Sequence, residues 1–266
     1  RLLLMSHQEI TSLHSPHVER VKALLGSRGK KIRNQEHLFV ADGMQSLRSA
    51  LHPHTDFAPH IQKIFVTPEG RLKLESEFPN EIHDHDVVNV SDAVMSAMTE
   101  TVSPQGVLAL CKYLPHSLES VSSAKKIAYF WQLQDPGNAG TAIRTADACG
   151  FDAVLFSDLS VDIYSPKVVR STAGSLWNIP IVEGVKLEAF FEWGSNRAMY
   201  AFDGDGSALL TDLKPSSDLA LIFGNEARGL PELPASTQIV SIPMKGHAES
   251  FNVASAAAIA MFHVSR

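Results

Sequence analysis

Short apolar runs alternate with helix-type segments through the second half of the chain, and this alternation limits the folds open to it. Each run is bounded by glycine, proline or polar residues, as a buried strand is. Strands separated by helices form a mostly parallel sheet with helices on both faces, so the predicted fold class is α/β. The predicted strands are 127–133, 153–156, 179–182, 198–202, 219–223 and 239–242. The predicted helices are 141–149, 165–174, 187–193 and 251–264.

The first half of the chain shows the same alternation on a smaller scale. Its βαβαβ order predicts a small α/β domain of its own. Between the halves, residues 114–126 are polar and rich in serine, which is typical of a linker. We therefore expect an N-terminal domain at 1–113, a linker at 114–126 and a second domain at 127–266. The predicted strands of the first half are 38–41, 61–67, 86–90 and 107–111, and its helices are 18–25, 44–51, 68–77 and 91–98.

Positive charge is concentrated near the N-terminus of an acidic chain. The 266 residues carry a net charge of −6, but residues 1–51 hold eight Lys or Arg against four Asp or Glu, a net of +4. The rest holds 15 against 25, a net of −10. A solvated helix face is one explanation, yet so dense a cluster is typical of phosphate contact, and we expect a basic loop at 27–34 that binds RNA. The predicted RNA-binding residues are Arg28, Lys30, Lys31 and Arg33.

Composition argues against several other classes of protein. No run of about 18 apolar residues occurs, so we expect no membrane span. The opening Arg-Leu-Leu-Leu-Met is too short for the apolar core of a signal peptide. Both cysteines, Cys111 and Cys149, lie among apolar residues, so neither a disulfide framework nor a metal site is expected. These patterns favour a reducing, cytoplasmic setting.

Three strand–loop stretches in the second half carry polar residues where the strand ends. They read QDPGNAGTAIRTADACG at 134–150, LALIFGNEARGL at 219–230 and SIPMKGHAESFNVASA at 241–256. Polar loops at the carboxyl ends of parallel strands are where α/β proteins build their sites. In this order the stretches resemble the three signature motifs of the SpoU–TrmH family, the ribose 2'-O-methyltransferase branch of the SPOUT superfamily.

The resemblance implies a fold, a cofactor and an assembly. Members of this family methylate RNA with S-adenosylmethionine, and their C-terminal half is threaded into a trefoil knot that residue spacing does not predict. They act as homodimers in which each active site borrows residues from the partner. The first half resembles, more loosely, the family's ribosomal-protein-like substrate-binding domain. The residues that carry this second resemblance are Lys31, Arg33, Phe39, Val40, Asp42, Gly43 and 103–110.

Polar residues of the three motifs are predicted to carry the chemistry. Arg144 is expected to contact the RNA phosphate beside the target ribose and to stabilise the developing alkoxide, since a guanidinium is a poor base. On the residues alone, a structural ion pair of Arg144 with Asp135 or Glu226 is the alternative. Asn138 and Gly140 are expected in a loop before the helix. The resemblance assigns active-site roles to Asn138, Arg144, Glu226, Ser250 and Asn252.

The same loops are predicted to hold the cofactor. Apolar side chains of the third motif would line a pocket for adenine and methionine, and the backbone at Gly224 and Gly229 would let the adenosine approach closely. Phe251 and Ala254 stand where the family more often has Leu and Ser. The predicted cofactor-binding residues are Phe223, Gly224, Asn225, Ile242, Met244, Phe251 and Asn252.

Together with these patterns, the resemblance implies S-adenosylmethionine-dependent methylation of a ribose 2'-hydroxyl in structured RNA. Ribosomal RNA is preferred because a separate N-terminal domain suits a structured target, and transfer RNA is the alternative. A non-catalytic RNA-binding paralogue is a third possibility, which the intact polar residues oppose. A Rossmann-type methyltransferase would carry its cofactor loop after the first strand, not late in the chain.

The last helix is rich in alanine, which leaves its packing open. We expect its small residues, among them Ala257 and Ala260, to face a partner copy across a two-fold axis. Tight packing against the helix's own sheet is the other explanation. Trp131 stands where a smaller or acidic residue is more usual, and the sequence assigns it no role.

Overall fold

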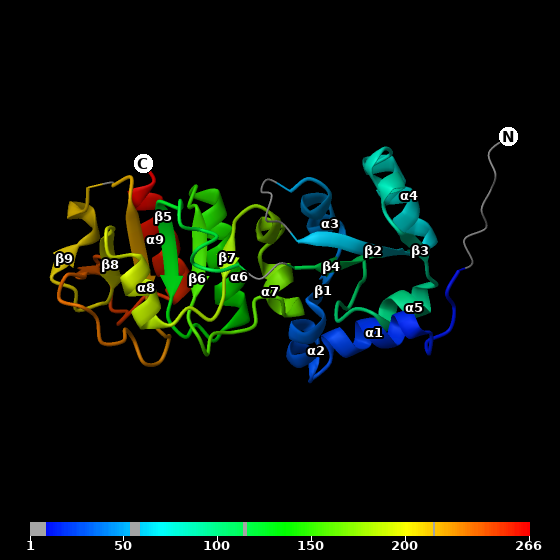
Figure 1. The fold of residues 1–266 in the computed structure, drawn as a ribbon, viewed down its shortest axis with the longest axis horizontal. Coiled ribbons are helices and arrows are strands. Elements are labelled where there is room, and N and C mark those ends of the chain that lie inside the picture. The colour runs from blue at the N-terminus through cyan, green and yellow to red at the C-terminus, as the bar shows by residue number, and fades with distance from the viewer. Residues whose placement is uncertain (1–8, 54–58, 114–115, 215) are drawn as a thin grey trace. The chain divides into compact units, whose positions relative to one another are not determined.

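The computed structural model describes residues 9–53, 59–113, 116–214 and 216–266, which form two compact units (Figure 1). Unit 1 comprises Arg1–Leu114 and Tyr164–Gly174, and unit 2 comprises Pro115–Ile163 and Ser175–Arg266. The chain first leaves unit 1 close to the boundary predicted at 113. The segment Tyr164–Gly174, which the prediction placed in the second domain, lies in unit 1.

Unit 1 is built on a four-stranded sheet with the order β1-β4-β2-β3. β4 pairs antiparallel with β1 and β2, whereas β2 and β3 are parallel. The apolar side chains of α1 join the core on this sheet. The strands are β1 Leu38–Asp42, β2 His60–Val66, β3 Val87–Asn89 and β4 Val107–Lys112. The helices are α1 Pro16–Leu25, α2 Gly29–Glu36, α3 Met44–Leu51, α4 Pro68–Glu77, the 3-10 turn Glu81–Asp84, α5 Asp92–Ala97 and α7 Pro166–Ser171.

The predicted basic loop at 27–34 is largely helix α2. Arg33 is buried, and its guanidinium donates to the Leu24 carbonyl at the end of α1. Gly29 packs against the same carbonyl, where a Cβ would lie 2.6 Å from the Arg33 guanidinium. This contact between α1 and α2 is invisible in a charge pattern. Arg33 is therefore corrected from an RNA contact to a structural residue, whereas Arg28, Lys30 and Lys31 are exposed.

Asp42, at the end of β1, ties this strand to the loop after α5. Its carboxylate accepts hydrogen bonds from the hydroxyls of Thr99 and Thr101, the latter at 2.5 Å. The start of α3 is met by Gln105, whose side-chain oxygen accepts the Met44 N–H at 2.9 Å. The loop after α5 is thereby tied to the end of β1.

The segment Tyr164–Gly174 packs on the β1 side of unit 1. The rings of Tyr164 and Tyr113 stack with their centroids 3.8 Å apart, and Tyr164 also lies 5.0 Å from Phe39. Arg170 of α7 pairs with Glu100 at 3.6 Å. These contacts join a late stretch of the chain to the core of the first unit.

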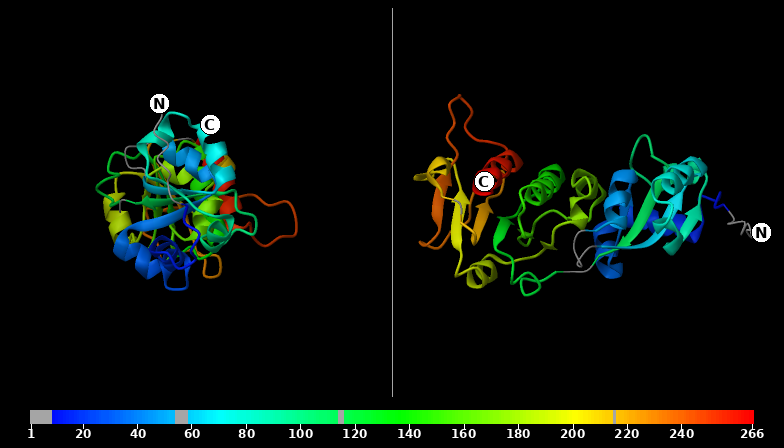
Figure 2. Two further views of the ribbon diagram at one scale, coloured as in Figure 1. Left: turned by 90° about the vertical axis from the view of Figure 1, so that its right-hand side faces the viewer. Right: turned by 90° about the horizontal axis from the view of Figure 1, so that it is seen from above.

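Unit 2 is a seven-stranded sheet with the order β7-β6-β5-β10-β8-β11-β9, in which every neighbouring pair is parallel. Helices flank the sheet (Figure 2), and the predicted α/β class is confirmed. The strands are β5 Lys126–Phe130, β6 Ala153–Phe156, β7 Ile181–Val182, β8 Ala198–Phe202, β9 Ala208–Leu209, β10 Leu219–Phe223 and β11 Gln238–Ser241. The helices are α6 Pro136–Ala148, the 3-10 turns Ser175–Trp177 and Leu210–Asp212, α8 Leu187–Trp193 and α9 Val253–Val264.

A ladder of four phenylalanines ends the central strands of unit 2. Phe156, Phe130, Phe223 and Phe202 are the last residues of β6, β5, β10 and β8, and they are paired in register. Their ring centroids are 5.5, 5.1 and 5.0 Å apart along the row. The opposite face carries Tyr129, which stacks on Phe190 of α8. The ladder gives the carboxyl edge of the sheet a rigid apolar floor.

The predicted linker is partly built into unit 2. Residues 114–115 lie outside the described residues, but Val121 and Ala124 are buried in the unit 2 core and Leu118 packs against them. These apolar residues recur every third position among serines, which hid them from a composition argument. The described part of 114–126 is a packed segment.

The two cysteines are free thiols. Cys111 is buried in β4, and Cys149 follows the end of α6. Burial raises the pKa of both thiols, so neither is an activated nucleophile. Within the described ranges, no helix combines the length and apolar character needed to cross a membrane.

Candidate active site

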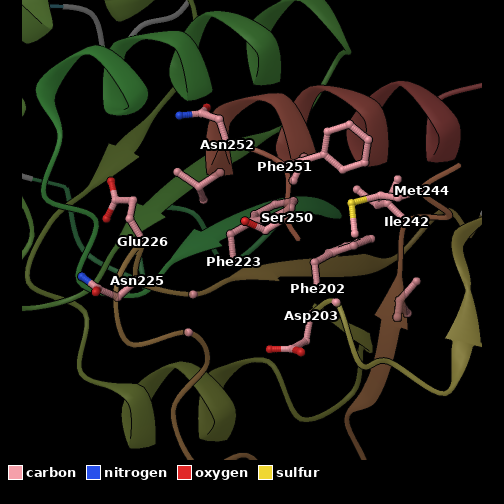
Figure 3. Close-up of a pocket in the computed structure, with 16 residues that line it drawn as sticks. Phe202, Asp203, Phe223, Asn225, Glu226, Ile242, Met244, Ser250, Phe251 and Asn252 are labelled. Carbon is pink, nitrogen blue, oxygen red and sulfur yellow. The ribbon is translucent and has the colours of Figure 1, made fainter. Parts of the chain in front are cut away.

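Four adjacent strands of unit 2 end at one edge of the sheet, and their loops gather there. β5, β10, β8 and β11 lie side by side and run parallel, so their carboxyl ends meet. Residues of the second and third motifs face one pocket there (Figure 3), and Asn138 of the first motif is hydrogen-bonded to both. The loops that follow these strands cover residues 131–135, 224–229, 203–206 and 242–252.

A pocket of about 340 Å³ opens between three of these loops and the start of α9 (Figure 3). Two members of the phenylalanine ladder, Phe202 and Phe223, form part of its apolar wall. The charged residues that line it, Asp203 and Glu226, are both carboxylates. All seven predicted cofactor-binding residues line this pocket. Besides Phe202, Phe223, Asp203 and Glu226, the residues that line the pocket are Gly204, Gly224, Asn225, Gly229, Val240, Ile242, Met244, Ser250, Phe251, Asn252, Val253 and Ala256.

The helix that presents Asn138 begins earlier than its sequence suggested. Asp135 is the N-cap, its carboxylate accepts the Asn138 N–H at 2.8 Å, and Pro136 occupies the first helical position. Asn138 and Gly140 therefore lie in the opening turns of α6, which corrects their placement in a loop. The capped start of α6 therefore fixes the backbone position from which the Asn138 side chain projects.

The loop after β10 is closed on itself. Asn225 and Gly229 exchange backbone hydrogen bonds of 2.9 Å, and the Asn225 side chain donates to the Gln132 carbonyl at 2.7 Å. Gly224 lies against this closure, because a Cβ there would come 2.5 Å from the carbonyl carbon of Gly229. Gly229 itself has a left-handed φ of +69°. Gly224 lines the pocket, but its small size is required by the loop rather than by a ligand.

A chain of side-chain hydrogen bonds joins the three motifs. The Asn252 amide donates to Asn138 Oδ1 at 3.0 Å, and the Asn138 amide donates to Glu226 Oε1 at 3.2 Å. The Glu226 carboxylate also accepts the N–H groups of Gln134 and Asp135 at 3.4 and 3.3 Å. Asn138 of the first motif is thus hydrogen-bonded to one polar residue of each of the other two motifs at the rim of the pocket.

Asn252 is the N-cap of α9. Its side-chain oxygen accepts two N–H groups of the first turn at 2.9 and 3.3 Å. Ser250 lines the pocket and is exposed, and in the described part of the chain its hydroxyl has no hydrogen bond. The loop before α9 projects from the body of unit 2 (Figure 2), and every residue from 245 to 252 is exposed.

Arg144 stands apart from the other four predicted catalytic residues. It lies six residues after Asn138 on α6 and does not line the pocket of its own chain. Its side chain is exposed and makes no ion pair or hydrogen bond among the described residues. The alternative pairing with Asp135 or Glu226 is not formed, since both carboxylates accept N–H groups around Asn138.

Two family models match the chain, one over each half. The SpoU rRNA Methylase family model matches residues 125–262, and the MRM3-like substrate binding domain matches residues 18–109. Over 240 residues the chain is 34% identical to the 23S rRNA (guanosine(2553)-2'-O)-methyltransferase RlmP of Bacillus subtilis, covering 88% of this chain and 91% of that protein. The chain belongs to the SpoU rRNA methylase family. The resemblance noted in its three motifs is thereby confirmed.

Solved methyltransferase structures share the architecture. An AdoMet-bound rRNA methyltransferase from Sinorhizobium meliloti is 28% identical, with a TM-score of 0.83 over 97% of both chains. The SpoU methyltransferase AviRb from Streptomyces viridochromogenes is 22% identical with a TM-score of 0.79, over 94% of this chain and 96% of that one, and supports the fold alone.

Asp203 is a pocket residue of this SpoU family member that the sequence reasoning missed. It directly follows β8, its Oδ1 accepts the Asp205 N–H at 3.0 Å, and it lines the pocket (Figure 3). The sequence shows only a turn signal at 204–206. Its position immediately after a buried strand is the signal that identifies it.

Proposed function

We propose that this chain transfers a methyl group from S-adenosylmethionine to the 2'-hydroxyl of a ribose in ribosomal RNA. The observation that carries the proposal is the hydrogen-bonded chain Asn252–Asn138–Glu226, which unites the three motifs at the rim of one pocket. Family membership supports it, because the B. subtilis and S. meliloti relatives are both named as rRNA methyltransferases.

The residues of the pocket fit an adenosyl amino acid. Its volume of about 340 Å³ is that of a small-molecule site, and its wall of Phe202, Ile242 and Met244 suits an adenine ring. The carboxylates of Asp203 and Glu226 give it a negative field, which suits a positively charged ligand. When bound, S-adenosylmethionine supplies the reactive methyl group on a positively charged sulfur.

The polar residues at the rim differ in whether their side chains are hydrogen-bonded within the chain. Asn138, Glu226 and Asn252 are committed to one another and to backbone N–H groups, so they position the loops and present fixed dipoles to the ribose. Among the described residues Ser250 has no such partner, and its hydroxyl is left to bind the ribose or the cofactor.

In this proposal, Arg144 of one copy of the chain acts in the active site of a second copy. Its exposed guanidinium lies outside its own pocket, which supports a homodimer whose subunits exchange this residue. There it binds the RNA phosphate and stabilises the developing alkoxide. The trefoil knot of the family stays a prediction.

The dimer contact expected at Ala257 and Ala260 is moved to another side of α9. Ala257 and Ala260 are buried within their own unit, so they account for the tight packing of α9 inside the chain. The exposed side of α9 carries Ile259 and Phe262, which are 37% and 58% exposed, and we assign the partner contact to them.

RNA capture is assigned to unit 1. The match to a substrate-binding domain at residues 18–109 and the exposed cations Arg28, Lys30 and Lys31 support this assignment. A separate binding unit favours structured ribosomal RNA over transfer RNA, and a cytoplasmic location is part of this proposal because it suits that substrate. A non-catalytic paralogue is disfavoured by the intact Asn138–Glu226 pair.

Two measurements test this function. Calorimetry with S-adenosylhomocysteine is expected to show about one site per chain, and no heat at millimolar ligand would refute the pocket. Mapping of 2'-O-methyl groups in a deletion strain is expected to reveal one lost rRNA position, restored by the wild-type gene and not by Asn138→Ala. A loss confined to transfer RNA would make that the substrate.

A further inference from the structure

Trp131 and Arg228 form a pair beside the pocket rather than inside it. Trp131 is the first residue after β5, and Arg228 lies in the loop after β10, the strand paired with β5. The Arg228 guanidinium lies 5.6 Å from the centre of the Trp131 ring. Glu226 and Gly229, which are close to Arg228 in the sequence, line the pocket, but neither Trp131 nor Arg228 does. The pair therefore lies at the carboxyl edge of the sheet, outside the lining of the pocket.

Both members of the pair are anchored through the backbone. The Trp131 N–H donates to the Phe223 carbonyl at 2.9 Å. The Arg228 N–H donates to the side chain of Asn225 at 3.0 Å, and that side chain donates to the Gln132 carbonyl at 2.7 Å. The two loops are thus joined at several points, and the pair keeps its place as long as they stay closed.

A second pair of the same kind shows what a structural arginine looks like in this chain. Arg197 lies 4.2 Å over Trp193, and its guanidinium also donates to three backbone carbonyls and pairs with Asp218 at 3.2 Å. Arg228 differs, because its side chain is exposed and makes no hydrogen bond or ion pair within the described residues. Its donors and its outer face remain open.

Arg228 is one of few cations in unit 2, which carries a net negative charge. Pro115–Ile163 and Ser175–Arg266 together hold 9 Lys or Arg and 16 Asp or Glu. Such a surface repels phosphate, so RNA contact at this edge relies on few cations. An arginine held against an indole offers a flat face for stacking as well as N–H groups.

We propose that Arg228, backed by Trp131, is a stacking platform for an unpaired nucleobase next to the target ribose. The proposal rests on the proposed function, because it takes RNA as the substrate. Proteins that read RNA sequence act mainly on unstacked bases, which they stack on aromatic rings and arginine planes. The platform would favour a target nucleotide in a loop or bulge over one inside a helix.

Two substitutions of Arg228 separate stacking from charge. Arg228→Lys keeps the charge and loses the plane, whereas Arg228→Gln loses both. One stacked base accounts for about a 5- to 150-fold change in affinity, so both variants should bind a single-stranded RNA of about 12 nucleotides more weakly by a factor in that range. Fluorescence anisotropy measures the affinity. If Arg228→Lys binds like the wild type, the contact is charge alone and the platform is overturned.

Lys125→Gln is the matched control for lost charge. Lys125 is exposed and precedes β5, at the opposite edge of the sheet, and this variant is expected to bind the RNA like the wild type. Trp131 supplies an independent signal, because saturating RNA should quench its emission, read as the difference between wild type and Trp131→Phe. Unchanged Trp131 emission overturns the placement of the base.

These readouts do not require catalysis. Affinity for S-adenosylhomocysteine is expected to be unchanged in every Arg228 and Trp131 variant, since neither side chain lines the pocket. A wild-type protein that binds the RNA probe but methylates no rRNA would refute the proposed function while the anisotropy and quenching results still decide the platform.

Discussion

Gly224→Ala adds one methyl group at the point where the loop after β10 closes. The new Cβ would lie 2.5 Å from the Gly229 carbonyl carbon and 2.7 Å from the Leu230 nitrogen, whereas ordinary contact begins at 3.4 Å. The obstacle is backbone, so relief requires Gly229 to move by about 1 Å. The 2.9 Å hydrogen bonds between Asn225 and Gly229 do not survive a shift of that size.

The cost appears in stability or in binding, depending on whether the loop stays closed. Overpacking of this kind costs about 1–3 kcal/mol. In a closed loop it lowers the Tm by about 2–12 °C, at about 2–4 °C per kcal/mol for a unit of this size. In an opened loop it lowers the affinity for S-adenosylhomocysteine by about 5- to 150-fold, because residues 224–226 line the pocket.

Gly246→Ala is the matched control. Gly246 lies in the loop after β11, a Cβ there meets nothing within 4 Å, and its φ is not left-handed. We expect its Tm within about 2 °C of the wild type and an unchanged affinity. Differential scanning calorimetry and titration calorimetry measure the two quantities. A Gly224→Ala protein that matches Gly246→Ala in both would refute the role assigned to loop closure.

Arg144→Ala is expected to abolish methyl transfer with unchanged Tm and cofactor affinity, since its exposed side chain has no partner among the described residues, and wild-type turnover on the mapped RNA would contradict its catalytic role. Neutralising the exposed cations at 28, 30 and 31 together is expected to reduce the salt slope of RNA binding, measured by anisotropy, by about 2 to 3, and an unchanged slope would place the RNA surface elsewhere. Ile259→Arg is expected to give a folded, inactive monomer by light scattering and circular dichroism, whereas Ala257→Arg, at a fully buried position, should unfold unit 2. An active Ile259→Arg monomer would rule out the composite site.

Regular elements were predictable where apolar runs end in clear turn residues. The bounds of α4, α8, β8 and β10 match the predicted ranges. Helix α2 was not predictable, because two glycines and dense charge hide a helix that the buried Arg33 holds against α1. The early start of α6 was missed because Gly137 and Gly140 suggest a loop, although Asp135 and Pro136 form a helix start.

The candidate site was predictable to the extent that motifs follow strands. Asn138, Glu226 and Asn252 gather because parallel strands end at one edge. The pairing of Trp131 with Arg228 depends on which strands are neighbours in the sheet, and a single sequence does not state the order of strands. The burial of Ala257 likewise depends on where α9 packs.

The return of Tyr164–Gly174 to unit 1 means that neither unit is one continuous stretch of polypeptide. During synthesis, residues 1–114 emerge without the ring that stacks on Tyr113 and without α7. Domains generally fold as they leave the ribosome, the N-terminal one first. Here the first unit completes its core only after β5, α6 and β6 have also been made. The two units must therefore mature together, and a gene divided after codon 114 would yield a first fragment with an unfinished core.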